Sequence, residues 1–465
     1  MQLKNSQKHY KVNNNDKKNI AVIGAGLTGL TTAFYLKRHG FNVRVFEKSD
    51  RAGGVIQTHS ENGFVFESGP NTGSMSRGEA AELFEDLKDD CSLEIADESA
   101  KARWIWLNNR WHTIPSGLIG GITTPLFSFA DKLRLLGEPF RKKGTNPEET
   151  IAEMVRRRMG KTFLRNAIDP FISGVYSGDP EKLVTKYAIP KLYELEQNFG
   201  SFIGGTIKKS KEPKSELDKK ASKEVFSASG GLENLIKALV KHIGEENISL
   251  NCENLSAKYA ENKGYTLEGD DTVYSNVIST IGAYNLERVF SFLPAEKLAK
   301  INQLEYAKVT QVTLGFKKWK GIPIQSFGGL VPSAEKRDVL GILLLSSFLK
   351  NRAPKGGALL SVFLGGVRKP QFIDFSDEEI VKLVEKEVVA MMGLKEFNPD
   401  LVKIFRYKHA IPQYSFESKD KLEAISSLEE EFPGLILAGN IRDGIGMADR
   451  IKQGRRIADQ LAAQV

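Results

Sequence analysis

Cysteine is scarce in this chain: Cys91 and Cys252 are the only two among 465 residues, and they form no closely spaced pair. That count excludes a disulfide framework and a thiolate zinc site, and it favours a reducing cytoplasm. Long apolar runs are missing too. The longest candidate, Val339–Leu349, contains two serines and is shorter than the roughly 18 apolar residues of a membrane-spanning helix. Residues 1–18 are polar and lack the apolar core of a signal peptide, so we expect a disordered tail there.

Histidine is also sparse, and the six present are scattered along the sequence. With no clustered ligands, we assign no metal-binding residue, and with no nucleophile motif we assign no catalytic residue. The length exceeds what one hydrophobic core usually serves, so two or three domains are expected.

The net charge of +8 is unevenly distributed. Between Asp131 and Arg165 there are ten Lys/Arg and five Asp/Glu, a net charge of +5, including the runs Arg141–Lys143 and Arg156–Arg158. An apolar stretch, Leu118–Phe129, precedes this cluster. Apolar residues beside basic ones suit the surface of an anionic bilayer, and the alternative is a solvated face of a helical domain. Nucleic acid is a poorer explanation because no binding motif accompanies the charge.

The stretch from Asn19 to Asn71 has the pattern of a dinucleotide-binding βαβ unit. An apolar strand over Ile20–Ile23 leads into a glycine-rich turn and a helix, and a second strand over Asn42–Phe46 ends at Glu47. Glycines in such a turn allow close approach to a pyrophosphate held at the helix N-terminus. Glu47 lies 23 positions after Gly24, where an acidic side chain binds ribose hydroxyls. The predicted phosphate-binding residues are Gly24, Ala25, Gly26, Leu27, Thr28 and Gly29.

A second glycine turn, Arg51–Gly54, follows Glu47 and favours FAD over a nicotinamide cofactor. A strand and a further turn over Gly63–Asn71 come next. Here the sequence resembles FAD enzymes of the amine-oxidase type, which carry such a turn against the diphosphate and flavin. Arg51 taken alone would be a solvated surface charge. The resemblance adds these cofactor-binding residues: Lys48, Arg51, Gly53, Gly54, Gly69, Pro70 and Asn71.

The middle of the chain predicts a hairpin followed by a helical insertion. Lys101–Gly117 alternates as a hairpin with Asn108–Asn109 as its turn, and Arg103 on its first strand could hold a substrate carboxylate. The alternative for Arg103 is an exposed strand arginine. Leu118–Lys208 is mainly helical, with a loop-like segment, Asp169–Pro180, in which Gly174 permits close backbone approach to a ligand.

The remaining segments predict two sheets. The strands expected to return to the nucleotide sheet are Ile248–Leu255, Thr272–Thr280 and Leu435–Ala438. A second, mostly antiparallel sheet is expected from Gln311–Phe316, Gly328–Val331, Gly341–Leu345 and Ala358–Leu364, with the helix Asp377–Met392 against it. A last helix begins near Ile445–Met447, where its N-terminal N–H groups could face the pyrimidine end of a flavin.

Four phrases make the resemblance more specific: PFISGVYSGDPEKL, PKLYELEQNFGSFIGG, FSASGGL and AGNIRDGIGMADRIKQG. They look like those of the oxygen-dependent, FAD-containing protoporphyrinogen oxidases, and the match covers nearly the whole chain. The resemblance implies an α/β fold with a discontinuous Rossmann-type FAD-binding domain of the p-hydroxybenzoate-hydroxylase kind, a mixed α+β substrate domain and an inserted helical domain. The implied boundaries are 19–90, 221–284 and 405–465 for FAD, 91–117 and 285–404 for substrate, 118–208 for a membrane-associating helical domain, and 209–220 for a charged linker.

The family implies a six-electron oxidation of protoporphyrinogen IX to protoporphyrin IX by FAD and dioxygen, with hydrogen peroxide as by-product. The hydrogen passes directly to the flavin. By position in the motifs, Arg103 would bind a propionate, Leu330, Leu343 and Phe363 would hold the macrocycle, and Gly174 would approach its reacting edge. The resemblance adds the cofactor contacts Leu255, Gly439, Ile445, Gly446 and Met447.

The expected site of action is the inner face of the cytoplasmic membrane, with hand-over of the porphyrin to a chelatase; a homodimer is left open. Coproporphyrinogen III oxidation is the nearest rival reaction. An amine oxidase or a carotenoid desaturase would share the FAD unit but not the four phrases, and a prenyl-protein-binding relative would share the fold without catalysis.

Overall fold

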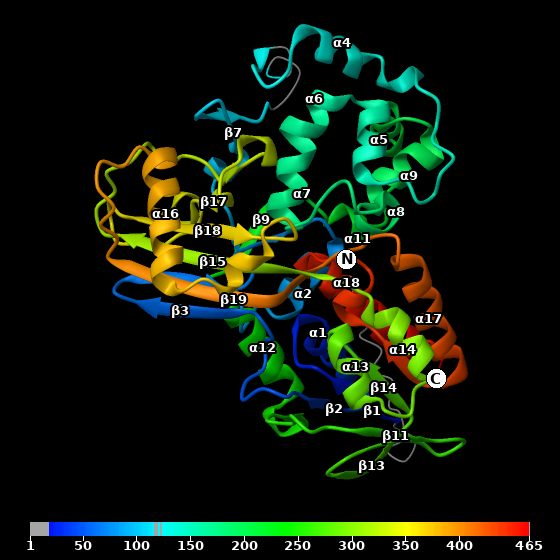
Figure 1. Ribbon diagram of the computed structural model, residues 1–465. Coiled ribbons are helices and arrows are strands. Elements are labelled where there is room, and N and C mark those ends of the chain that lie inside the picture. Colours follow the sequence, from blue (N-terminus) through cyan, green and yellow to red (C-terminus); the bar gives the residue numbers. More distant parts are fainter. Residues whose placement is uncertain (1–17, 116–119, 121–122, 465) are drawn as a thin grey trace, which may run out of the picture.

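The computed structural model describes residues 18–115, 120 and 123–464, and two large sheets and a helical insertion organise them (Figure 1). The predicted tail lies outside the described residues except for Lys18. Within the described ranges, no helix is both long and apolar enough to cross a membrane.

Five parallel strands form the nucleotide-binding sheet, in the order β10-β2-β1-β14-β20. Their bounds are Ile248–Ser249, Asn42–Phe46, Asn19–Ile23, Asn276–Ser279 and Leu435–Leu437. The strands come from three separated parts of the chain, so the unit is discontinuous. The predicted α/β fold class is confirmed.

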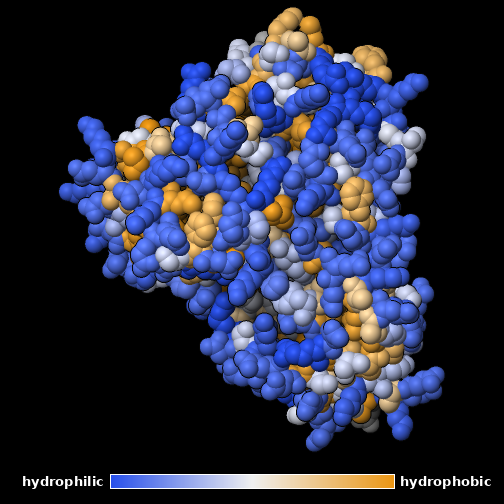
Figure 2. Space-filling view, in the orientation of Figure 1, coloured by the Kyte–Doolittle hydropathy of each residue, from blue (hydrophilic) through white to orange (hydrophobic). Residues whose placement is uncertain are grey.

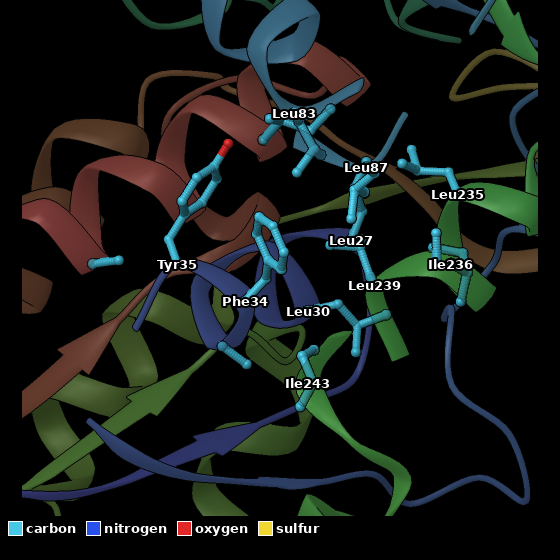
Figure 3. Close-up of a cluster of buried hydrophobic side chains, with 14 of the residues drawn as sticks. Leu27, Leu30, Phe34, Tyr35, Leu83, Leu87, Leu235, Ile236, Leu239 and Ile243 are labelled. Carbon is cyan, nitrogen blue, oxygen red and sulfur yellow. The ribbon is translucent and has the colours of Figure 1, made fainter. Parts of the chain in front are cut away.

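One face of this sheet is covered by four helices, α1 (Leu27–Arg38), α2 (Gly78–Asp86), α12 (Glu233–Ile243) and α18 (Met447–Ala462). Figure 3 shows the apolar cluster between them, with Leu30 and Phe34 of α1 near Ile243 of α12. Gly454 lets α18 lie close to α1, because an added Cβ there would be 2.8 Å from the Thr28 carbonyl oxygen. The close packing fixes the N-terminus of α1 relative to that of α18.

The other face of the sheet packs against α13 (Leu286–Val289), α14 (Ala295–Asn302) and α17 (Ser418–Glu431). A three-stranded meander, β11 (Ala257–Ala260), β12 (Gly264–Leu267) and β13 (Asp270–Tyr274), lies beside them. The sequence assigned residues 285–404 to the substrate domain, but Leu286, Phe290 and Ile301 are fully buried in this nucleotide-side core. The helices α13 and α14 therefore belong with the first sheet.

The second sheet has seven strands in the order β19-β15-β18-β17-β16-β7-β8. Their bounds are Leu401–Pro412, Tyr306–Phe316, Ala358–Gly365, Val339–Leu343, Gly328–Leu330, Arg103–Leu107 and Arg110–Thr113. The pairs are antiparallel except β16 with β7, and α16 (Asp377–Met392) covers one face as predicted. The hairpin β7–β8 turns at Asn108 and Asn109, whose φ values of 52° and 57° suit a tight hairpin turn.

Strand β19 corrects a predicted boundary. The sequence placed the boundary between the substrate and FAD domains between residues 404 and 405. This boundary falls inside β19, an edge strand that pairs along β15. Polar residues at Lys403, Arg406 and Lys408 weaken the apolar alternation, and this is why the strand is hidden in the sequence.

Two small sheets join these units. The hairpin β3 (Gln57–Glu61) and β4 (Phe64–Ser68) runs toward the second sheet, and β9 (Val225–Ala228) pairs with β5 (Gly73–Ser74) and β6 (Leu93–Ile95).

The insertion is helical, as predicted. Its helices include α4 (Phe129–Leu136), α5 (Ile151–Arg158), α6 (Lys161–Phe163), α7 (Asp169–Val175), α8 (Thr185–Ala188), α9 (Pro190–Phe199) and α10 (Phe202–Lys209). The segment predicted as loop-like over Asp169–Pro180 is helix α7 in its first half, because Pro170 at a first-turn position is compatible with a helix. The predicted linker holds a short helix, α11 (Glu216–Lys219), packed so closely that a Cβ on Gly78 would lie 1.8 Å from the Leu217 carbonyl oxygen.

The basic run Arg156–Arg158 lies largely inside the insertion rather than on a solvated face. Arg158 is fully buried, and its guanidinium donates to Glu138 and Glu196, each at 2.6 Å. Burial opposes ionisation of Glu138, but hydrogen bonds from Phe202 N and Ser201 Oγ, with the Arg158 pair, outweigh it and lower its pKa. Arg157 also pairs inside the insertion, donating to Glu149 and Glu196, each at 2.8 Å. Arg157 and Arg158 therefore stabilise the fold, and the run cannot be counted as a lipid-facing cluster.

Candidate active site at the junction of the two sheets

The glycine-rich turn forms a backbone cradle at the N-terminus of α1. Gly24 has a φ of +100°, and a Cβ on Gly29 would lie 1.9 Å from the Gly24 carbonyl oxygen, so the turn must pack directly on the helix. Gly26 differs, because a Cβ there would meet nothing within 4 Å. The open space lies at a helix N-terminus, where unpaired N–H groups bind phosphate. The residues present thus fit a pyrophosphate.

The second glycine turn lies against the first. Gly53 N donates to the Ala25 carbonyl oxygen at 2.8 Å, and an added Cβ on Gly54 would be 3.3 Å from Gly26 Cα. The Arg51 guanidinium donates to the carbonyl oxygens of Ala52, Gly54 and Ile56. Arg51 therefore holds the shape of this turn, a role that the sequence does not reveal, and its contact with the cofactor stays a prediction.

Glu47 lies at the carboxyl end of β2, beside the cradle. Its buried carboxylate accepts from Ala25 N at 2.8 Å and from Ser49 N at 3.0 Å. Lys48, the next residue, is exposed. Leu255 and Phe46 both line a surface depression of about 540 Å³. The carboxylate is thus fixed next to the phosphate cradle, as the predicted ribose contact requires.

The C-terminal loop approaches the same cradle through Thr280. The Thr280 hydroxyl lies 3.1 Å from the Gly24 carbonyl oxygen, and a Cβ on Gly439 would be 2.6 Å from the Thr280 carbonyl oxygen. Gly446 caps α18, so the predicted helix N-terminus at Ile445–Met447 is confirmed. Thr280 was not predicted as a site residue, although the predicted strand Thr272–Thr280 ends at it.

The third turn, after β4, links the cofactor side to the second sheet. Gly69 has a φ of +86° and packs on Val55, with Pro70 following it. Asn71 Oδ1 accepts from Ser361 Oγ of β18 at 3.0 Å. One face of the second sheet therefore looks toward the predicted flavin turns.

The predicted substrate residues share that face. Side chains alternate between the two faces along a strand, and residues paired across strands point to the same face. The pairs are Gly328↔Arg103, Leu330↔Gly341, Leu343↔Ser361 and Gly341↔Phe363. They put the predicted substrate side chains on the face opposite α16. The structure thus brings together Arg103, Leu330, Leu343 and Phe363. Leu330, Leu343 and Phe363 are half-buried, while Arg103 is exposed with its guanidinium 5.4 Å from the centre of the Phe327 ring.

Gly174 reaches the same face from the insertion. It lies in α7, and an added Cβ would be 2.4 Å from Leu330 Cδ2. The expected close approach is therefore to another predicted substrate residue, and a direct approach to the ligand stays a prediction.

A buried lysine lies behind the C-terminal loop. Lys421 Nζ is 4.5 Å from the centre of the Tyr414 ring, and the Tyr414 hydroxyl lies 2.8 Å from the Asn440 carbonyl oxygen. No described carboxylate pairs with Lys421. Burial, with a smaller effect from Arg442, lowers the pKa of Lys421 to about 7.

This lysine predicts a pH dependence of stability. Above pH 7 the folded protein loses a proton that the unfolded chain keeps up to about pH 10.4, so unfolding free energy rises with pH across that window. We expect Lys421→Met to be more stable than the wild type by a few kcal/mol near pH 6, with the difference shrinking toward pH 10. Urea unfolding of both proteins at several pH values measures this, and a pH-independent difference would contradict it.

Comparison with known proteins identifies the class. A family model described as flavin-containing amine oxidoreductase matches residues 27–462. The chain belongs to this family and is an FAD-dependent oxidoreductase, which confirms the cofactor predicted from the glycine turns.

Two similar proteins within this family are named as porphyrinogen oxidases. Protoporphyrinogen oxidase 2, chloroplastic/mitochondrial, of Arabidopsis thaliana is 30% identical over 477 residues, covering 95% of this chain and 93% of the relative. Coproporphyrinogen III oxidase of Bacillus subtilis (strain 168) is 26% identical over 469 residues, covering 94% and 97%. The predicted resemblance to this group of oxidases is confirmed.

A solved structure shows the same fold. It is from Exiguobacterium sp. 255-15, provisionally assigned as a protoporphyrinogen oxidase, and has a TM-score of 0.79 at 22% identity, covering 96% of this chain and 99% of the other.

Proposed function

We propose that this protein oxidises protoporphyrinogen IX to protoporphyrin IX in porphyrin biosynthesis, with dioxygen as electron acceptor. The observation that carries the proposal is the apolar sheet face of Leu330, Leu343 and Phe363, which looks toward the flavin turns and has Arg103 on the same side. An apolar tetrapyrrole with carboxylate side chains matches that surface. The Arabidopsis relative supports the substrate class.

Each residue has a task that needs no protein nucleophile. Arg103 pairs with no carboxylate among the described residues and can hold a propionate with two parallel hydrogen bonds. The leucines and Phe363 orient the macrocycle and keep water from its reacting carbon. Bound FAD would supply the chemistry of three two-electron oxidations, in which the electrons of one porphyrinogen reduce three dioxygen molecules to three of hydrogen peroxide.

The choice of protoporphyrinogen over coproporphyrinogen rests on the apolar tip of the insertion. Phe129, Leu133 and Leu136 follow one face of α4 and are 76%, 53% and 68% exposed, and Phe140 beyond them is 90% exposed. Figure 2 shows apolar residues gathered at this outer end of the molecule. A membrane-facing enzyme suits the less charged substrate.

This tip corrects the predicted lipid-facing residues. Part of the stretch Leu118–Phe129 lies outside the described residues. Of the rest, Phe129 is exposed at the tip, but Leu126 is buried and Phe127 stacks on Phe163, with ring centres 5.2 Å apart. Arg141–Lys143, directly after Phe140, remains as the basic flank.

Membrane contact through this tip predicts that replacing its apolar residues weakens binding to lipid vesicles. Leu136→Ser with Phe140→Ser should weaken sedimentation with phosphatidylcholine/phosphatidylglycerol vesicles more than tenfold, since each buried apolar side chain contributes about 1.5–3 kcal/mol. Phe416→Ser with Val273→Ser, which are 49% and 50% exposed elsewhere, should not. Equal binding of the two double variants would remove the tip from the interface.

Arg103 predicts a binding effect rather than a cofactor effect. Arg103→Ala should raise KM for the porphyrinogen about tenfold through loss of a charged hydrogen bond, with flavin content unchanged. Arg110→Ala is the matched control, because Arg110 lies on the other strand of the same hairpin and is likewise exposed. An unchanged KM in Arg103→Ala would remove this residue from the site.

The rival substrate can be tested directly. The Bacillus subtilis relative favours coproporphyrinogen III as the second candidate. We expect porphyrin fluorescence to give a higher kcat/KM with protoporphyrinogen IX than with coproporphyrinogen III, both under air. The reverse order would overturn the choice.

A further inference from the structure

Helix α7 is fastened to the second sheet at its N-terminal end. The Asp169 side chain, 8% exposed, accepts from Ser333 N at 2.7 Å and from Arg368 Nη1 at 2.6 Å. Ser333 lies between β16 and β17, and Arg368 lies just after β18. One carboxylate therefore joins the helix to two parts of the sheet.

The C-terminal end of α7 is fastened to the same sheet. Arg368 Nη2 donates to Asp179 Oδ1 at 2.8 Å, and Val367 N donates to the Ser177 carbonyl oxygen at 2.9 Å. Gln413, at the end of β19, donates to the Tyr176 carbonyl oxygen at 2.9 Å. Arg368 thus bridges the first residue of the helix and a residue that follows its end.

Between these anchors the helix presents an apolar stripe. Phe171, Gly174 and Val175 are three and four positions apart and share one side of α7. Gly174 touches Leu330, while Phe171 and Val175 remain 40% and 44% exposed beside it. Gly341 also lies close to Leu330, because an added Cβ there would lie 3.1 Å from Leu330 Cδ2. The stripe therefore continues the apolar sheet face.

We propose that Arg368 is a positioning residue, which holds α7 against Leu330 through Asp169 and Asp179 and so sets the width of the macrocycle site. The inference rests on the proposed function, because it assigns α7 as a wall for that substrate. Arg368 does not itself touch the macrocycle.

The chemistry of the bridge favours arginine. A planar guanidinium donates in two directions at fixed angles, whereas a lysine ammonium is a single point of charge. Burial opposes ionisation of Asp179, but hydrogen bonds from Arg368 and Glu181 N outweigh it and lower its pKa. Without the guanidinium, the carboxylates of Asp169 at the start of α7 and Asp179 beyond its end would repel each other.

The test compares Arg368→Met with Arg406→Met. Arg406 has the same 30% side-chain exposure and pairs with Asp377 at 2.7 Å, on the opposite face of the same sheet. We expect Arg368→Met to raise KM for protoporphyrinogen about tenfold with kcat within twofold and flavin content unchanged. The KM of Arg368→Lys should fall between those of the wild type and Arg368→Met. The KM of Arg406→Met should match that of the wild type.

A double-mutant cycle separates positioning from general loosening. In a Leu330→Ala background the contact with Gly174 is gone, so adding Arg368→Met should change KM less than twofold. Amide hydrogen exchange should also quicken over residues 170–178 in Arg368→Met, and not over α5. Additive KM effects, or unchanged exchange in α7, would overturn the role of Arg368.

Different results contradict the proposed function and the role of Arg368. A wild-type protein that oxidises no porphyrinogen contradicts the proposed function. An active wild type with unaltered KM in Arg368→Met contradicts only the positioning role.

Discussion

Gly26→Val is expected to abolish flavin retention while leaving the fold intact. The backbone at Gly26 has an ordinary φ of −75°, and an added Cβ meets no atom within 4 Å, so the folded protein accepts the side chain. The side chain would occupy the space over the N-terminus of α1, where the pyrophosphate must approach the backbone.

The measurement is flavin absorbance per protein after gel filtration, with unfolding followed by circular dichroism. FAD affinity should fall more than about tenfold, and Gly26→Ala should lie between valine and wild type. Gly137→Ala is the control, because Gly137 directly follows α4 with a similar φ of −79° and an added Cβ there would meet its neighbours at ordinary contact distances. A yellow Gly26→Val protein with wild-type flavin content would contradict the assignment of the cradle.

Arg158→Met is expected to be the most destabilising single change in the insertion. It leaves the carboxylates of Glu138 and Glu196 buried without their shared cation, a loss of about 3–5 kcal/mol. Arg156→Met on the same helix removes only a half-exposed pair with Glu181 and should cost about 1 kcal/mol or less. Urea unfolding at neutral pH distinguishes the two variants. Equal unfolding midpoints would contradict the stabilising role of the buried ion pairs of Arg158.

The same cluster predicts acid sensitivity. The pKa values of Glu138 and Glu196 are lowered in the folded protein, because hydrogen bonds and arginines outweigh the opposing effect of burial. Groups with depressed pKa stabilise the fold above their unfolded pKa of about 4.3, and this contribution is lost as pH falls below it.

Local patterns in the sequence predict much of the fold. The strand, glycine turn and helix of the first unit place every backbone group of the cradle within one short stretch, so Gly24–Gly29 and Glu47 could be found by spacing. The helix Asp377–Met392 ends where predicted, because Ser376 caps its start and Gly393 adopts a left-handed conformation at its end.

Features that depend on distant partners could not be predicted in the same way. Arg158 looks like a surface charge until Glu138 and Glu196 are folded around it, and Arg51 looks solvated until its turn supplies three carbonyl oxygens. Helix α7 was hidden by its glycine, serine and proline residues, whose helical state depends on anchoring at both ends. Arg103 and Leu330 come from strands more than two hundred residues apart, and only the parallel pairing of β7 and β16 brings them together.

The most direct measurement for the central claim is anaerobic mixing of the flavin-loaded protein with protoporphyrinogen IX. We expect the visible absorbance band of the oxidised flavin to bleach before air is admitted, because one bound flavin accepts two of the six electrons. When air is admitted, the band should return and porphyrin fluorescence should appear. A band that stays unchanged in the presence of porphyrinogen would contradict flavin-dependent porphyrinogen oxidation by this protein.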